Sequence, residues 1–350
     1  MYFLDDSLLP ENQEKLVIQV APYGPQWIPS DSNDIPVTFD EQVQKAVDCY
    51  NAGATVLHLH VRETDGKGSK KMSQFNKMIE LLQQAVPEMI IQVGGSISFA
   101  PEDEGAAASW LDYDTRHMLA ELNPKPDQVT IAINSSQMNL CEIMSADDIA
   151  GTILEKPEYH QAYSEMVVDA KPSFFIEHLK RLQANDIQPH FMLGNIHQLE
   201  TVDRLIRKGI YTGPLNLNYV AIAGGSAGID PSDLIQFTKR CPAGSILTYE
   251  CLMRSVLPMN TMAIALGMHV RVGIEDNLWG RKSERMSSVQ QVEKTVRVAR
   301  ELYRDVATAK EAREIYKIGK KYKSAEETIH QLGMAPNRKL GQRGFTVPGH

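Results

Sequence analysis

The stretch Thr55-Val56-Leu57-His58-Leu59-His60-Val61 predicts a buried strand, because it is filled with β-branched and aliphatic residues. Gly53 precedes it, and the turn signal Asp65-Gly66 follows it. An amphipathic segment, 39–51, comes just before and predicts a helix. The same alternation of a short apolar run and an amphipathic segment recurs eight times along the 350 residues.

The eight predicted strands are 16–20, 55–61, 90–93, 128–133, 188–193, 215–221, 245–251 and 269–272. The helices predicted after them are 39–51, 74–86, 113–122, 174–184, 198–208, 231–239, 259–266 and 289–306. Eight alternations favour an α/β fold of the (β/α)₈ TIM-barrel type over an open doubly wound sheet. The alternative is a sheet with fewer strands and a second domain, but no linker or shift in composition marks a boundary.

We therefore predict a single barrel domain over residues 16–309, with an N-terminal arm, 1–15, and a C-terminal helical extension, 310–350. An irregular insertion, 138–171, interrupts the pattern after the fourth strand. The extension is rich in lysine. We expect one helix in it, 325–332, within a tail that reaches outward toward a neighbouring subunit.

The composition is that of an ordinary soluble globular protein, with 43% hydrophobic and 23% charged residues. The net charge of −8 argues against a nucleic acid or an anionic membrane as the main partner. The four cysteines are scattered, without a Cys-x-x-Cys pair, and we find neither a secretory signal nor an apolar run of membrane-spanning length. We therefore expect a cytoplasmic protein without disulfides.

His58 and His60 carry the strongest functional signal. Side chains two residues apart on a strand share a face, so both imidazoles can reach one metal ion. Glu275 follows the eighth predicted strand, which neighbours the first and hence the second in a closed barrel. Two histidines and one carboxylate leave a coordination position open, as catalytic metal sites do. Zinc is the first candidate, while Co²⁺, Mn²⁺ and Fe²⁺ also fit this set of ligands.

Other polar residues surround this predicted site. Asp276 would be free to act as a general base, and Arg271 could keep it ionised or stabilise an oxyanion. The other interpretation is that Asp276 only caps its loop. Arg62 either orients a ligand or lies on the surface, and His190 on the fifth strand is the main rival for a fourth metal ligand.

Two glycine clusters follow strands and could bind an anion through backbone amides. The first comprises Gly94, Gly95 and Ser96 after the third strand, and the second contains Gly224, Gly225 and Ser226 after the sixth. The signal is weak alone, because glycine-rich turns are common for geometric reasons. Neither cluster is a dinucleotide fingerprint or a P-loop.

With these residues in place, the chain resembles the β-keto acid cleavage enzyme family from about residue 16 to residue 309. The resemblance is carried by Ala52-Gly53-Ala54-Thr55-Val56-Leu57-His58-Leu59-His60-Val61-Arg62 and by His269-Val270-Arg271-Val272-Gly273-Ile274-Glu275-Asp276-Asn277, with 204–210 in support. It implies a (β/α)₈ barrel, usually tetrameric. It also implies a divalent metal, typically zinc, on His58, His60 and Glu275.

The resemblance further implies an acyltransferase reaction, in which a β-keto acid and acetyl-CoA give acetoacetate and a new acyl-CoA. Asp276, assisted by Arg271, would deprotonate the carbon between the keto group and the carboxylate. The metal would stabilise the enolate. The enolate would attack acetyl-CoA, CoA would move to the distal acyl group, and a retro-Claisen step would separate the products. We assign Gly224, Gly225 and Ser226 to the binding of acetyl-CoA.

The candidate substrate residues are Gln26, Gly94, Gly95, Ser96, Asn134 and Met192. All of them except Asn134 depart from the family member that acts on an aminated substrate. Gln26 stands where that member has a Glu, Met192 replaces an acidic residue, and Gly94–Ser96 replaces a Ser-Thr-Gly-Gly loop. The carboxylates that would neutralise an ammonium group are therefore missing, which favours a neutral, moderately apolar β-keto acid.

Three other functions stay open. A metal-dependent aldolase or C–C lyase would use the same enolate chemistry without coenzyme A. An amidohydrolase is less favoured, because Met192, Asn216 and Asn218 replace a second set of ligands. A barrel without catalytic activity could bind a small acid or store metal.

Overall fold

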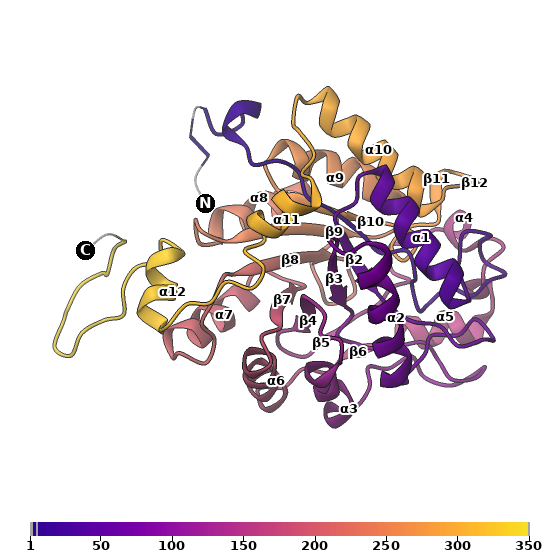
Figure 1. The fold of residues 1–350 in the computed structure, drawn as a ribbon, viewed down its shortest axis with the longest axis horizontal. Helices are drawn as coiled ribbons and strands as arrows, with labels where there is room; N and C mark the ends of the chain where they lie inside the picture. Colours follow the sequence, from indigo (N-terminus) through magenta and orange to yellow (C-terminus); the bar gives the residue numbers. More distant parts are fainter. Residues whose placement is uncertain (1–2, 5, 349–350) are drawn as a thin grey trace.

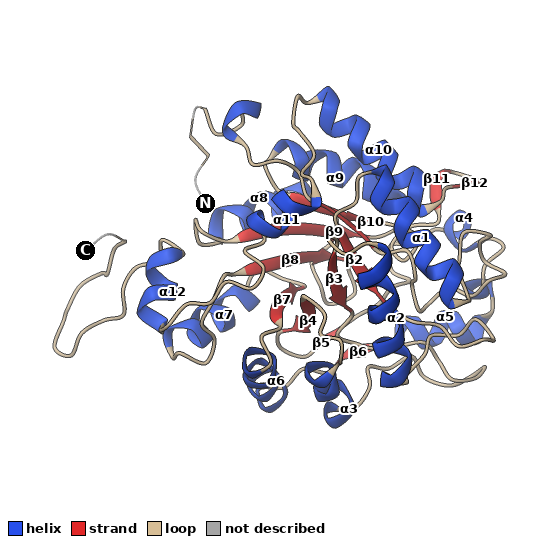
Figure 2. Cartoon of the chain, viewed as in Figure 1, coloured by secondary structure: helices blue, strands red, loops and turns tan. Residues whose placement is uncertain are grey.

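Eight parallel strands close into a barrel in the computed structural model, which describes residues 3–4 and 6–348 (Figures 1 and 2). Around the barrel the strands follow their order in the chain, and β1 closes the ring against β10. All eight strands that the sequence predicts are present, so the barrel prediction is confirmed. Their bounds are β1 Ile18–Val20, β2 Val56–Leu59, β3 Ile90–Val93, β4 Gln128–Ala132, β7 Gln188–Leu193, β8 Asn216–Ala221, β9 Ile246–Cys251 and β10 His269–Val272.

A helix follows each barrel strand and covers its outer side (Figure 2). α1 begins with a complete capping box at Thr38, in which the threonine hydroxyl accepts from the Glu41 amide and the Glu41 carboxylate accepts in return. The helices are α1 Phe39–Ala52, α2 Met72–Ala85, α3 Tyr113–His117, α6 Pro172–Ala184, α7 Gln198–Arg207, α8 Pro231–Arg240, α9 Val256–Ala265 and α10 Ser288–Glu301.

Two of the predicted helices are too long. The segment 113–122 forms the short α3 and then a 3₁₀ turn, Met118–Glu121. The segment 289–306 ends as α10 at Glu301, because Tyr303 adopts a left-handed φ of 57°. Arg304 then turns inward, where it is buried and donates hydrogen bonds to the carbonyls of Glu14, Ile264, Gly267 and Met268.

The insertion after β4 lies beside the carboxyl ends of the strands. It contains β5 Ser136–Gln137, α4 Ala146–Ile149, α5 Pro157–Ser164 and β6 Val167–Val168. Figure 1 shows α4 and α5 at the right, next to the small hairpin of β11 Trp279–Arg281 and β12 Glu284–Arg285. The insertion therefore covers the end of the barrel where active sites of this fold lie.

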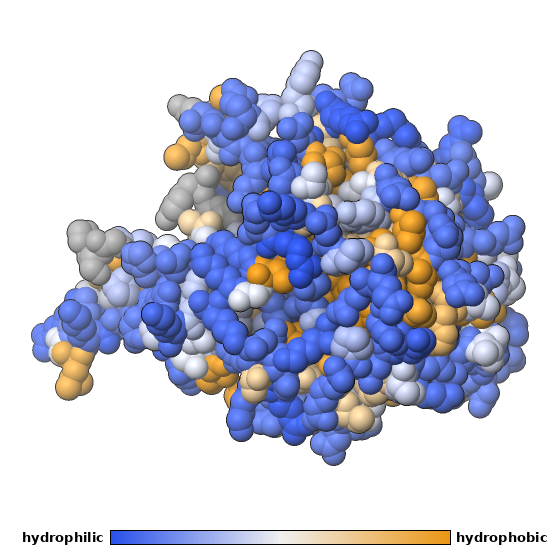
Figure 3. Space-filling view, in the orientation of Figure 1, coloured by the Kyte–Doolittle hydropathy of each residue, from blue (hydrophilic) through white to orange (hydrophobic). Residues whose placement is uncertain are grey.

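The C-terminal segment lies at the opposite end of the barrel, at the left of Figure 1. It contains α11 Ala309–Ile315 and α12 Ala325–Gln331, so the predicted helix is present. The segment does not only reach outward, because α12 packs on α7 and the Tyr316 side chain is fully buried at the base of the barrel. Residues 335–348 form an arm in which Leu340 and Phe345 are fully exposed. Figure 3 shows an apolar group at the tip of this arm, next to hydrophilic residues of the arm.

The interior of the barrel is unusually polar. Barrels of this type are normally filled by branched apolar side chains. Here the strands bury amide and imidazole side chains instead, among them Gln19, Gln92, Gln128, His190 and Asn216. Among the described residues, every helix is too short or too polar to traverse a lipid bilayer.

Candidate active site

His58 and His60 lie side by side at the carboxyl end of β2, His60 one residue beyond it. Both side chains are buried, and their Nε2 atoms are 3.2 Å apart. The His60 Nδ1 atom is 2.7 Å from the carbonyl oxygen of Ile97, and the His58 Nδ1 atom is 2.8 Å from the Gln92 Oε1 atom. Because a carbonyl oxygen only accepts, both Nδ1 atoms carry the proton, and both Nε2 lone pairs face each other.

Glu275 completes the group that the sequence predicts. Its Oε1 atom lies 3.6 Å from the His58 Nε2 atom and 3.7 Å from the His60 Nε2 atom. One ligand atom from each of the three residues falls within 4.8 Å of the others. The strand order β10, β1, β2 brings them together across more than 200 residues of sequence.

This arrangement fits a divalent cation. Two imidazole lone pairs and a carboxylate oxygen converge in a buried space, where without a cation they would repel one another. The second carboxylate oxygen of Glu275, Oε2, is buried and has no partner among the described residues. Imidazole nitrogen and carboxylate oxygen are ligands that Zn²⁺ accepts, with a position left for substrate.

Arg271 lies beside the three predicted ligands and binds three carboxylates. Its guanidinium donates to both oxygens of Asp276, at 2.8 and 2.9 Å, and to the Glu275 Oε1 atom at 2.7 Å. It also lies 3.3 Å from the Glu250 Oε2 atom, at the carboxyl end of β9. All four side chains are buried, so one guanidinium is shared among three carboxyl groups.

The charges of the site shift several pKa values. Burial lowers the pKa of both imidazoles, so His58 and His60 are neutral and able to bind a metal. Burial raises the pKa of the Glu275 carboxyl, but Arg271 and the imidazoles more than reverse this and bring that pKa to about 2. Burial raises the pKa of Asp276 well above its usual value, although Arg271 opposes the shift.

The loop after β10 is held from two sides. The Gln291 side chain, in the first turns of α10, accepts from the Gly273 amide at 3.1 Å and donates to the Asn277 carbonyl at 2.7 Å. The main-chain carbonyl of Glu275 accepts from the Trp27 indole at 3.2 Å. Glu275 and Asp276 are therefore positioned by their backbone as well as by Arg271.

A pocket opens over the two histidines and the Arg271 cluster. Its lining combines these polar groups with seven apolar side chains. The apolar lining residues are Phe99, Trp110, Met138, Leu140, Met192, Ile222 and Leu252. Met138 and Leu140 belong to the insertion, which explains how that segment contributes to the site.

Comparison with known proteins identifies the family. The family model described as beta-keto acid cleavage enzyme matches residues 15–318. The chain belongs to the beta-keto acid cleavage enzyme family. The resemblance found in the sequence is thereby confirmed.

Several relatives resemble the chain over most of its length. It is 29% identical over 310 residues to the 3-keto-5-aminohexanoate cleavage enzyme of Acetoanaerobium sticklandii, a match that covers 88% of this chain and 100% of the relative. It is 23% identical to the 3-oxoadipate:acetyl-CoA acetyltransferase of Cupriavidus necator, covering 85% of this chain and 93% of that one. Among solved structures, apo ObcA shares the fold, with a TM-score of 0.61 and 14% identity over 82% of this chain and 66% of ObcA.

The structure of this family member brings most of the predicted substrate residues to the pocket. Gln26, Gly94, Gly95, Ser96 and Met192 all line it. The Gln26 amide, however, donates to the main-chain carbonyl of Glu275, so part of its hydrogen-bonding capacity is used within the protein.

Asn134 and the second glycine cluster lie apart from the metal ligands. Asn134 donates to the Thr201 hydroxyl. Together with Ser226 it lines a neighbouring cavity. Met192 and Ile222 line both this cavity and the first pocket. Gly224 packs closely against Asn139 and Gly225 against Gln137, so the start of the insertion covers this loop.

The structure bears on two further single residues. Arg62 does not lie on the surface, so that interpretation is wrong. It is buried, and its guanidinium donates to the carbonyls of Tyr23, Gly24, Trp27 and Gly66, which shapes the loop after β1. His190 is not part of the candidate metal group found among the described residues. It lies deeper in the barrel, in register with Thr130 and Asn216.

Glu250 is the site residue that the sequence interpretation missed. A signal was available, because Glu250 stands at the carboxyl end of the seventh predicted strand, as His58 and Glu275 do on theirs. Most of the apolar lining was not predictable in this way. Phe99, Trp110, Met138 and Leu140 lie in loops whose paths no periodic pattern determines.

Proposed function

We propose that this chain converts a neutral β-keto acid and acetyl-CoA into acetoacetate and the corresponding acyl-CoA. The observation that carries the proposal is the juxtaposition of the His58, His60 and Glu275 group with Asp276 and Arg271 in one pocket. Family membership supports it, and so do relatives named for acetyl-CoA-dependent transfer from 3-oxoadipate and 3,5-dioxohexanoate.

In this proposal Asp276 accepts the proton from the carbon between the keto group and the carboxylate. Its raised pKa suits a base that must hold a proton briefly. Arg271 keeps the Asp276 carboxylate in place through two hydrogen bonds. His58, His60 and Glu275 would hold the divalent metal, for which zinc is our first candidate, and a metal bound there would supply Lewis-acid polarisation of the substrate oxygens.

The apolar lining supports a neutral acyl chain. Glu250, Glu275 and Asp276 all face Arg271. We assign Glu275 to the metal and Asp276 to proton transfer, so in this proposal no carboxylate of the pocket is reserved for an ammonium group. An aliphatic chain would contact Phe99 and Leu140 and bury apolar surface at about 25 cal/mol per Å².

A substrate panel tests the proposal. We expect acetyl-CoA-dependent formation of acetoacetate from 3-oxohexanoate, with a kcat/KM at least tenfold higher than that for 3-keto-5-aminohexanoate or 3-oxoadipate, because an unpaired charge is costly in an apolar pocket. His58→Ala and Asp276→Asn should each abolish the reaction while the circular dichroism spectrum stays unchanged. A preference for the aminated substrate contradicts our assignment of the acyl group, and full activity of both variants contradicts the assigned roles.

The open alternatives predict different results in the same assay. An aldolase or lyase would consume the β-keto acid without acetyl-CoA, whereas a barrel without catalytic activity would bind metal and turn over none of the acids. Loss of substrate when acetyl-CoA is omitted would therefore favour the lyase.

For the acetyl group of acetyl-CoA we propose the second cavity, between Asn134 and Ser226, because it adjoins the substrate pocket at Met192. Ser226→Phe should raise the KM for acetyl-CoA more than the KM for the β-keto acid. An equal rise in the KM for acetyl-CoA and the KM for the β-keto acid would contradict this assignment.

We also propose that the chain forms a homo-oligomer, the tetramer implied by the family resemblance, in the cytoplasm. The exposed Leu340, Phe345 and Val347 of the C-terminal arm support a contact with a second copy, because isolated arms rarely expose several large apolar side chains. Mass photometry of the full chain and of the Leu340→Ser, Phe345→Ser double variant tests the oligomer; a monomer for the full chain contradicts it.

A further inference from the structure

A chain of hydrogen-bonded glutamine side chains crosses the barrel from His58 to the C-terminal segment. His58 Nδ1 lies 2.8 Å from Gln92 Oε1, and Gln92 Nε2 donates to Gln128 Oε1 at 2.9 Å. Gln128 Nε2 then donates to Gln188 Oε1 at 2.7 Å. Gln188 Nε2 donates to the main-chain carbonyl of Tyr316 at 3.0 Å and to that of Lys317 at 3.2 Å.

These glutamines occupy adjacent strands in register. Gln92 on β3 pairs with Gln128 on β4, which pairs with Gln188 on β7. Gln19 on β1 also donates to Gln92, past the intervening strand β2, which requires both side chains to lie inside the barrel. Gln92 and Gln128 are fully buried, and Gln188 is nearly so. Water therefore does not compete for the amides of Gln92 and Gln128, and each of these two must find its partner in the chain.

The direction of the chain follows from its last link. A main-chain carbonyl only accepts hydrogen bonds, so Gln188 must present its NH₂ group to Tyr316 and Lys317. Its oxygen is then turned toward Gln128, which must donate. Gln128 in turn presents its oxygen to Gln92, so the Gln92 oxygen faces His58. Reversing any one amide would place two donors or two acceptors against each other.

The orientation of Gln92 decides which nitrogen of His58 carries the proton. Facing the Gln92 oxygen, His58 is protonated on Nδ1 and keeps the Nε2 lone pair toward His60 and Glu275. Facing the amide NH₂ group, it would be protonated on Nε2 and could not bind a metal there. Partners on the second nitrogen of a ligating histidine commonly change metal affinity 10- to 100-fold.

We propose that Gln92, Gln128 and Gln188 are positioning residues. The Tyr316 and Lys317 carbonyls fix the orientation of the Gln188 amide, and each amide fixes the next. The orientation of Gln92 then leaves the Nε2 atom of His58 unprotonated and able to bind the metal. The inference rests on the metal group of the proposed function. It assigns a role to the C-terminal segment. The Tyr316 and Lys317 carbonyls, at the base of the barrel, keep His58 at the carboxyl end of β2 in the tautomer that can bind a metal through Nε2.

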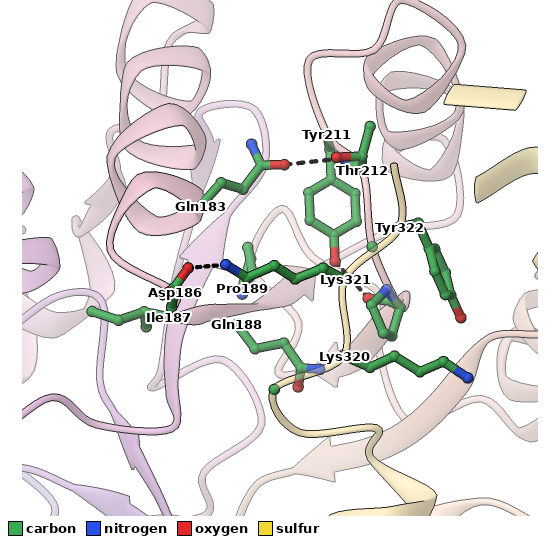
Figure 4. A pocket seen from close by; sticks show the side chains of 13 residues that line it. Gln183, Asp186, Ile187, Gln188, Pro189, Tyr211, Thr212, Lys320, Lys321 and Tyr322 are labelled. Carbon is green, nitrogen blue, oxygen red and sulfur yellow. Dashed lines mark hydrogen bonds and ion pairs between the residues drawn. The ribbon is translucent and has the colours of Figure 1, made fainter. Parts of the chain in front are cut away.

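The same region provides a matched control. Asn216 on β8 is fully buried and also donates to the Tyr316 carbonyl, at 3.1 Å, but it does not belong to the chain that leads to His58. Figure 4 shows the setting of Gln188, which lines a cavity of about 160 Å³ together with Tyr211 and with Lys320 and Tyr322 of the C-terminal segment. Asn216→Leu and Gln188→Met thus each remove one buried amide side chain that donates a hydrogen bond to the Tyr316 carbonyl.

The experiment combines two measurements on the full chain. The first is the Kd for Zn²⁺, from competition with a chelator. The second is the ring ¹⁵N spectrum of the metal-free protein labelled at histidine, with the His58 signals identified by their loss in His58→Asn. The variants are Gln128→Met, Gln188→Met, Asn216→Leu and the double variant Gln92→Glu, Gln128→Met. In the double variant both carboxylate oxygens of residue 92 accept, so His58 no longer depends on the chain.

We expect Gln128→Met and Gln188→Met to raise the Kd for Zn²⁺ about tenfold and to give His58 a mixture of the two neutral tautomers. Asn216→Leu should change neither the Kd for Zn²⁺ nor the His58 tautomer. Gln92→Glu, added to Gln128→Met, should restore the wild-type Kd and the single tautomer. An unchanged His58 spectrum in Gln128→Met and Gln188→Met overturns the inference, as does an equal effect of Asn216→Leu. If the wild type binds no Zn²⁺, the proposed metal site is wrong, while the tautomer spectrum still decides the positioning role.

Discussion

Gly94 shows how one missing side chain makes the metal group possible. A Cβ atom at this position would lie 2.3 Å from the His60 Cε1 atom and 3.1 Å from the His58 Nε2 atom. The glycine therefore lets the loop after β3 pass close to the Nε2 atoms of both imidazoles. The sequence interpretation assigned Gly94 to the substrate; it lines the pocket and also lies against His58 and His60, the proposed metal ligands.

We expect Gly94→Ala to displace His60, raise the Kd for Zn²⁺ at least tenfold and destabilise the fold by about 1–3 kcal/mol through overpacking. Gly228→Ala is the control, because a Cβ atom there would meet no heavy atom within 4 Å. Chelator competition and chemical denaturation measure the two effects. Wild-type affinity in Gly94→Ala would mean that the loop relaxes without moving the ligand.

His178 makes stability depend on pH. Burial, with His117 and Arg116 nearby, lowers the pKa of His178 to about 3, whereas an unfolded histidine titrates near pH 6.5. The unfolded state therefore binds more protons between these values, so stability is complete above about pH 6.5 and falls as the pH drops toward 3. His178→Leu should flatten this fall in urea denaturation, and His330→Leu, at an exposed position, should leave it unchanged. Equal slopes for His178→Leu and the wild type would contradict this assignment.

Among the elements, α10 does more than cover β10. Its Gln291 side chain bridges Gly273 and Asn277, the two ends of the loop that carries Glu275 and Asp276. The adjacent Gln290 only completes the capping box with Ser287. The two glutamines were equivalent in the sequence, because both fall in the first turns of an amphipathic helix.

We expect Gln291→Met to reduce kcat about tenfold, since a small displacement of a catalytic group has a cost of this order or larger. Gln290→Met should lower only the free energy of unfolding, by about 0.5–1 kcal/mol, through the weakened cap. Steady-state kinetics and urea denaturation separate the two variants. Similar kcat values for both would show that the loop holds its shape without α10.

The elements also show what could be predicted from the sequence. The eight strands were predictable from the sequence. So was the convergence of His58 and His60, from β2, with Glu275, from the loop after β10, because parallel strands bring their carboxyl ends to one edge. The ends of α3 and α10 were not, because a 3₁₀ turn and the inward turn of Arg304 depend on tertiary contacts. Predicting the contact of Glu250 with Arg271, or the Gln92–Gln128–Gln188 chain, requires the register between strands, which cannot be read from the sequence.

For the molecule as a whole, metal binding should stabilise the native state only, because the three ligands converge from distant parts of the chain. Zn²⁺ at 100 times its Kd would add about 2.7 kcal/mol to the free energy of unfolding. We expect a chelator to lower the Tm by several degrees, and added Zn²⁺ to restore it. His60→Ala should abolish this response, and a response that persists in His60→Ala would place the metal elsewhere.

Isotope transfer from acetyl-CoA examines the proposed reaction itself. The protein is incubated with Zn²⁺, unlabelled 3-oxohexanoate and acetyl-CoA carrying two ¹³C atoms in its acetyl group, and the products are analysed by mass spectrometry. We expect acetoacetate with both ¹³C atoms in its acetyl portion, together with an equal amount of unlabelled butanoyl-CoA. Unlabelled acetoacetate, or consumption of the acid without butanoyl-CoA, would contradict the proposed function.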